Sequence, residues 1–155
     1  MQPAILDTNV LLLLLVGLYD ERFIEAFKRT RKYDRPTFRL VWQFANAALA
    51  ILVTPQILAE VSNLSLQMPA GRLRDYFACA VGPLWQMSEE HVPKDKLLAV
   101  PALHKLGFTD ASILEACRTR GCAVLTDDLP LYGILCKNKH PAFNLNHLRG
   151  QLYLR

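Results

Sequence analysis

The stretch AILDTNVLLLLLVGLYD, residues 4–20, places a short polar segment between two apolar runs. Residues 3–6 are apolar and short enough for a buried strand, and Val10–Val16 is an unbroken apolar run. The length of that second run predicts a helix that is buried nearly all round. The simplest arrangement is therefore a strand, a polar turn and a helix, with the Asp7 carboxylate and the Asn9 amide at the turn.

This apolar run is too short to cross a membrane. Asp7 and Asp20 enclose only 12 positions, whereas a membrane-spanning helix needs roughly 20 apolar residues. An export signal would begin with basic residues, but no Lys or Arg precedes Arg22. We therefore expect a cytoplasmic protein without a membrane partner.

Length and composition predict one globular domain over residues 1–155. The chain is 52% apolar and 21% charged, which allows a core of useful size. Its cysteines show neither a CxxC pair nor zinc-ligand spacing, and we expect reduced thiols at Cys79, Cys117, Cys122 and Cys136.

Several segments carry helix signals. We expect a charged helix over 20–32 and an apolar helix within 35–50. Thr54 as N-cap and Pro55 at the first position predict the next helix. A further helix over 70–81 should end at Gly82-Pro83, and residues 84–92 fit either a strand or a helix.

The C-terminal half continues the alternation of strands and helices. Thr109 as N-cap and Gly121 as stop predict a short helix, and residues 122–125 predict a buried strand. Residues 143–155 could add an edge strand or a last helical turn. The alternation predicts an α/β fold, a three-layer α/β/α sandwich with a central, mainly parallel sheet of four to five strands.

Four acidic positions are unusual for solvated acids. Asp7 and the pair Asp127-Asp128 directly follow predicted strands, and parallel strands bring such residues to the same carboxyl edge of the sheet. In the helix predicted from Pro55, Glu60 lies roughly 60° from the apolar stripe. In the helix predicted from Thr109, Asp110 lies on the inward face. Taken singly, each could be a helix cap, a turn residue or the edge of a helix face.

Together, these acids would repel one another unless they were protonated or neutralised. A hard divalent cation neutralises them, and oxygen-only ligands favour Mg²⁺ or Mn²⁺ over Zn²⁺. Such a site is typical of phosphoryl transfer or phosphodiester hydrolysis.

The sequence resembles the PIN-domain ribonucleases, especially the toxins of VapBC systems. The resemblance rests on the order and spacing of ILDTNVLL, TPQILAEVSNL, FTDASILEAC and AVLTDDLPLYGIL, and it spans nearly the whole chain. It implies a PIN-like fold in which one or two Mg²⁺ or Mn²⁺ ions are bound by the catalytic acids Asp7, Glu60, Asp110 and Asp128. Asn9, Thr126 and Asp127 would support them.

The resemblance also implies a mechanism and partners. A metal-activated water attacks phosphorus in line, and RNA is the substrate. The basic segment alone could be a solvated surface, but with RNA as substrate we expect it to bind phosphates through Lys28, Arg29, Arg31, Lys32 and Arg35. A toxin would have a small antitoxin partner and could form a homodimer.

Two alternatives remain open at this stage. One is a PIN-like module that binds RNA or protein without cutting, and the other is a housekeeping RNA-processing nuclease without an antitoxin. The sequence assigns no role to residues 65–105 or to Asn144, Asn146, His147 and Arg149.

Overall fold

The computed structural model describes residues 1–154, which fold around one five-stranded parallel sheet. The strand order is β3-β2-β1-β4-β5. The strands are β1 (Ala4–Leu6), β2 (Ile51–Val53), β3 (Ser88–Glu89), β4 (Ala123–Thr126) and β5 (Ala142–Asn144). All four neighbouring pairs run parallel, which confirms the predicted parallel sheet.

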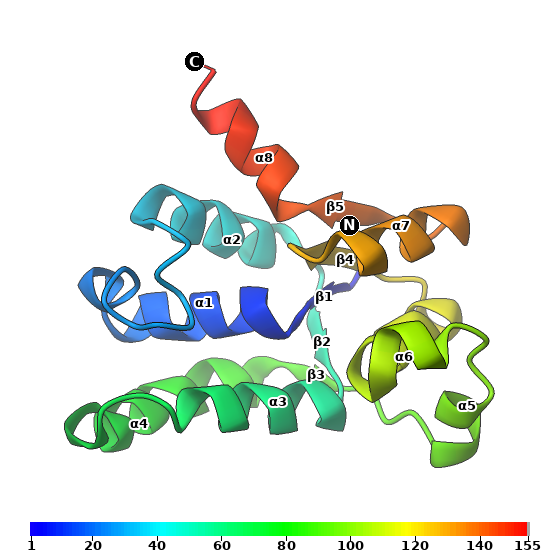
Figure 1. Ribbon diagram of the computed structural model, residues 1–155, viewed down its shortest axis with the longest axis horizontal. Helices are drawn as coiled ribbons and strands as arrows, with labels where there is room; N and C mark the ends of the chain where they lie inside the picture. The colour runs from blue at the N-terminus through cyan, green and yellow to red at the C-terminus, as the bar shows by residue number, and fades with distance from the viewer. Residues whose placement is uncertain (155) are drawn as a thin grey trace.

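Helices cover both faces of the sheet (Figure 1). In this view α1 to α4 lie to the left of the strands, and α5 to α7 lie to the right. The helical elements are α1 (Thr8–Tyr19), the 3₁₀ turn η1 (Glu21–Phe23), α2 (Arg35–Ala47), α3 (Pro55–Ser65), α4 (Ala70–Gln86), α5 (Lys94–Leu98), α6 (Leu103–Arg120), α7 (Leu129–Lys137) and α8 (Leu145–Leu152). The predicted three-layer α/β/α sandwich is confirmed.

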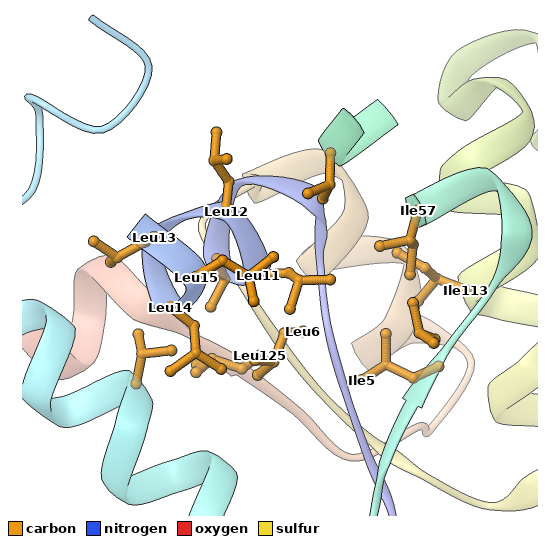
Figure 2. Close-up of a cluster of buried hydrophobic side chains, with 14 of the residues drawn as sticks. Ile5, Leu6, Leu11, Leu12, Leu13, Leu14, Leu15, Ile57, Ile113 and Leu125 are labelled. Carbon is orange, nitrogen blue, oxygen red and sulfur yellow. The ribbon is translucent and has the colours of Figure 1, made fainter. Parts of the chain in front are cut away.

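Helix α1 is the centre of the core, as the apolar run predicts. Its leucines from Leu11 to Leu15 are each at most 3% exposed. Figure 2 shows these side chains projecting from α1 in several directions, near Leu6 and Leu125 of β1 and β4. Contacts with α2, α3 and α4 surround the helix. The buried helix therefore holds the preceding turn, which contains Asp7, firmly against the sheet.

Local end signals correctly predict two helix boundaries. The Thr54 hydroxyl accepts a hydrogen bond from the Ile57 N–H at 3.3 Å, and Pro55 is the first residue of α3. Gly121 closes α6 in the left-handed conformation with φ of 61°, which glycine adopts without steric cost.

The charged helix expected over 20–32 is wrong. Only η1 and isolated turns form there. The Thr30 hydroxyl donates to the Ile24 carbonyl at 2.7 Å, a bond between residues that would lie about 9 Å apart along a regular α-helix. Phe23, Ile24 and Phe27 are nevertheless buried, so packing against the core holds the irregular segment. The helix expected within 35–50 is α2.

The stop expected at Gly82-Pro83 is also wrong, because α4 continues to Gln86. Pro83 lacks one backbone N–H, but Leu84 beyond it packs against the core, which keeps the last turn in place. Residues 88–89 then form the short strand β3, which settles the ambiguity in 84–92.

Two boundaries in the C-terminal half differ from expectation. Helix α6 begins at Leu103 and bends at Gly107, which has φ of 76°, so Thr109 is not its N-cap. Strand β4 covers 123–126 rather than 122–125. The tail forms both the edge strand β5 and the helix α8. Within residues 1–154, no helix is long and apolar enough to span a membrane.

Candidate functional site

Parallel pairing of β1 with β4 brings the first predicted acid to the last two. Leu6 and Leu125 are register partners, and the Asp7 N–H donates to the Leu125 carbonyl at 3.1 Å. Asp7 therefore lies beside Thr126 and Asp127 at the carboxyl edge of the sheet. This placement is the one predicted from the strand-end positions.

The Asp7 carboxylate is almost fully buried and is held by several donors. One oxygen accepts from the Val10 N–H at 3.0 Å, which caps α1. The other accepts from the Thr126 hydroxyl and from the Asp127 N–H, the latter at 3.2 Å. Burial and the nearby Asp127 charge raise the pKa of Asp7 to about 7, although these hydrogen bonds oppose the rise. Asp7 therefore caps α1 and is also a buried acid whose charged form is disfavoured.

A second group of acids surrounds Asp110 on α6. This side chain is half-buried, whereas Glu60 on α3 and Asp128 before α7 are exposed. Burial, then the charges of Asp128 and Glu60, raise the pKa of Asp110 to about 7. Within residues 1–154, no hydrogen-bond donor is found at the Asp110 carboxylate to offset this. The three acids come from elements far apart in sequence yet share one electrostatic environment.

Hydroxyl groups connect the two groups of acids. The Thr8 hydroxyl, next to Asp7, donates to Glu60 at 3.4 Å. The Thr126 hydroxyl donates to Asp7 and accepts from the Asp128 N–H at 2.9 Å. The four predicted acids therefore surround one edge of the sheet. No Asp7–Asp110 contact is seen in the described chain.

Near Asp110, two buried hydroxyls join the N-cap of α3 to α6. Thr54 and Ser112 lie 2.8 Å apart, and the Ser112 hydroxyl also donates to the Thr109 carbonyl at 2.6 Å. These bonds fix the first turn after the bend in α6, where Asp110 lies. The sequence gives no signal for this Thr–Ser pair.

In the part of the chain that the structure describes, no group of three or more His, Cys, Asp and Glu side chains is arranged to hold a metal ion as it stands. Two of the acids have other contacts, since Asp7 caps α1 and Asp128 caps α7 through the Leu131 N–H at 2.8 Å. The donor set nonetheless fits a hard divalent cation. It offers only carboxylate oxygens, and Asp110 has a raised pKa that a cation would lower.

Asp127 differs from the other acids because it is already neutralised. Its carboxylate lies 2.6 Å from the Lys32 ammonium, accepts from the buried Tyr33 hydroxyl, and accepts from the Asn9 amide at 3.4 Å. Burial alone would raise the pKa of Asp127, but the hydrogen bonds and charge of Lys32 and the Tyr33 bond hold it below its ordinary value. Sequence reasoning placed Asn9 correctly near the acids but missed Tyr33.

Of the five predicted RNA-binding residues, Lys32 is the one that contacts these acids in the described part of the chain. Arg29 instead donates to Gln67 at 2.7 Å. All five side chains are exposed: Lys28, Arg29, Arg31, Lys32 and Arg35. We call these five exposed side chains the basic surface, and Lys32 is its member at the acidic edge.

The tail, which had no predicted role, packs beside Asp127. The Asn146 amide donates to the Asp127 carbonyl at 3.3 Å, and Arg149 donates to the Lys32 carbonyl at 3.3 Å. The Arg149 guanidinium also lies 5.7 Å from the centre of the Tyr33 ring. Helix α8, which projects from the sheet in Figure 1, thus holds the segment that carries Lys32.

No family model matches the chain, and no curated protein matches it. The crystal structure of PAE2754 from Pyrobaculum aerophilum is similar to this protein, with a TM-score of 0.59 and 17% sequence identity. The match covers 99% of this chain and 97% of that one. At this identity the likeness shows a shared α/β fold.

Proposed function

We propose that this protein is a metal-dependent ribonuclease of the PIN-domain type, which hydrolyses phosphodiester bonds in RNA. The observation that carries the proposal is the environment of Asp110. This half-buried carboxylate has a pKa raised to about 7, by burial and by the charges of Asp128 and Glu60. Acids held together in this way are typical of functional sites.

Asp7, Glu60, Asp110 and Asp128 are the residues that would hold Mg²⁺ or Mn²⁺. Such a cation, when bound, neutralises the acids and supplies an activated water for attack on phosphorus. The chain's own contribution is positioning. Thr126 and the N-terminus of α1 orient Asp7, and Thr8 orients Glu60. The exposed acids leave the edge open to a substrate as large as RNA.

The basic surface supports RNA as the substrate. Exposed Lys and Arg side chains attract a phosphate backbone, and Lys32 places this surface directly next to the acids. A polyanion bound there would have its backbone guided toward Asp110 and Asp128. The formal net charge of +4 agrees with a polyanionic partner.

The test is RNA cleavage by the purified protein with Mn²⁺, compared with Asp110→Asn. This substitution keeps the shape of the side chain and breaks no hydrogen bond of the described chain. We expect Asp110→Asn to lose at least about 100-fold in rate. The matched control is Asp95→Asn, whose side chain is 87% exposed on α5. If wild type and Asp110→Asn leave every RNA equally intact, the protein is a binding module without catalysis.

The finer proposal is a cytoplasmic toxin with a small antitoxin partner. Exposed apolar side chains support a protein partner, since Trp85 is 83% and Trp42 is 47% exposed. Expression should arrest growth, and Asp110→Asn should relieve the arrest. Harmless expression of an active nuclease would favour a housekeeping role in RNA processing.

A further inference from the structure

Of the five acids at the carboxyl edge, Asp127 is the one that is paired with a cationic side chain within residues 1–154. Asp127 accepts from Lys32, Tyr33 and Asn9 together, so both of its carboxylate oxygens are engaged. Asp110, by contrast, has neighbouring carboxylates and no donor within residues 1–154. An added cation would therefore gain most by binding next to Asp110, where the carboxylates are not neutralised.

We propose that the site binds a single divalent cation and that the Lys32 ammonium permanently takes the place of a second one, at Asp127. This inference rests on the proposed function and deepens it, because it assigns the number of metal ions and the residue that fixes that number. Asp127 then acts as a positioning residue for Lys32 rather than as a metal ligand.

Lys32 is well held for this role. Its ammonium lies 2.6 Å from Asp127, whose side chain is only 6% exposed, while the Lys32 side chain is 54% exposed. Charge pairs of this kind are stronger where one partner is shielded from water. A second divalent cation at Asp127 would have to displace this ammonium.

The surrounding elements fix the backbone of Lys32 as well as its side chain. Arg149 on α8 donates to the Lys32 carbonyl, and Asn146 donates to the Asp127 carbonyl. One helix therefore holds both partners of the ion pair, which lie 95 positions apart in the chain. This gives the tail a role that sequence reasoning could not assign.

The experiment is Mn²⁺ titration followed by calorimetry and by electron paramagnetic resonance, on wild type and on Lys32→Met. Methionine keeps the length and apolar stem of lysine but removes its charge. We expect wild type to bind a single ion with an uncoupled Mn²⁺ spectrum, and Lys32→Met to bind a second ion at the Asp127 carboxylate that the ammonium has released. Lys28→Met is the matched control, because it removes an exposed charge of the same segment without touching Asp127.

A second variant, Lys32→Met with Asp127→Asn, should return to a single ion, since the released carboxylate is gone. Two ions in wild type, or one ion still in Lys32→Met, would overturn the Lys32 inference while leaving a metal-dependent nuclease intact. No Mn²⁺ binding by wild type would overturn the proposed function as well.

Discussion

The Thr126 hydroxyl donates a hydrogen bond to the buried Asp7 carboxylate across two neighbouring strands. The Thr126 hydroxyl oxygen also accepts a hydrogen bond from the Asp128 N–H at 2.9 Å, so one hydroxyl connects two of the four predicted metal ligands. Thr126 lies at the end of β4 and is fully buried. The side-chain geometry of the acidic edge therefore depends on this residue.

Thr126→Val should lower the free energy of unfolding by about 1–3 kcal/mol, because the buried Asp7 oxygen loses a donor and the shape of the side chain is kept. It should also raise the pKa of Asp7 further, since the lost bond favours the charged carboxylate. Urea denaturation measures the first effect. Thr119→Val, on the exposed end of α6, is the control and should change stability by less than about 0.5 kcal/mol.

Asp110 should make the metal-free protein less stable as pH rises. In the unfolded chain this acid loses its proton near 3.8, whereas the folded protein keeps it until the pH reaches about 7. The folded state therefore binds more protons across this window, and the Asp110 contribution to stability is lost between these pH values.

Asp110→Asn should remove that loss, so at pH 8 the metal-free variant should exceed wild type by about 1–3 kcal/mol, allowing for screening of a half-buried group. Thermal unfolding at pH 4 and pH 8 measures it. A variant that is less stable than wild type at pH 8 would show that Asp110 is not an electrostatically strained acid.

Gly17 of α1 lies directly against the Phe38 ring of α2. A Cβ at this position would lie 2.6 Å from Phe38 Cγ and closer still to other ring atoms. Phe38 is buried, so it has little room to move. Gly17→Ala should therefore cost about 1–3 kcal/mol in the free energy of unfolding. Gly133→Ala, in α7 with open space around it, should be neutral or stabilising by up to about 1 kcal/mol, as read from urea denaturation.

The basic surface should bind single-stranded RNA with strong salt dependence. Removing one phosphate contact, as in Lys28→Ala or Arg31→Ala, should weaken binding at low salt and reduce the slope of log affinity against log salt by about 0.7. Fluorescence anisotropy with a labelled RNA analogue that resists cleavage measures both the affinity and its dependence on salt. Lys105→Ala, in α6 outside this surface, should leave the slope unchanged.

Much of the fold follows from local signals in the sequence. The apolar run after Asn9 predicts the buried helix α1, because a helix that is apolar on every side must lie in the core. Thr54 and Gly121 mark helix ends locally, Thr54 through its side-chain hydroxyl and Gly121 through its left-handed backbone. The errors arise where distant packing decides. Residues 20–32 form turns held by the core, and α4 passes Pro83 because Leu84 still finds core contacts.

The candidate site divides in the same way. Strand-end positions place Asp7 and Asp127 at one edge, since parallel strands align their carboxyl ends. The pairing of Lys32 with Asp127 could not be predicted, because these residues meet only through an irregular segment whose path the sequence does not specify. Tyr33 and Arg149 join them for the same reason.

Divalent-cation binding at the acidic edge is tested by a crystal structure of the protein soaked with Mn²⁺, in which the anomalous signal locates the ion. We expect a peak at the carboxyl edge of the sheet, with carboxylate oxygens of Asp110 and Asp128 about 2.1 Å from the ion. An Mn²⁺ peak elsewhere, or an acidic edge that stays free of Mn²⁺ in crystals of catalytically active protein, would contradict a metal site at these acids.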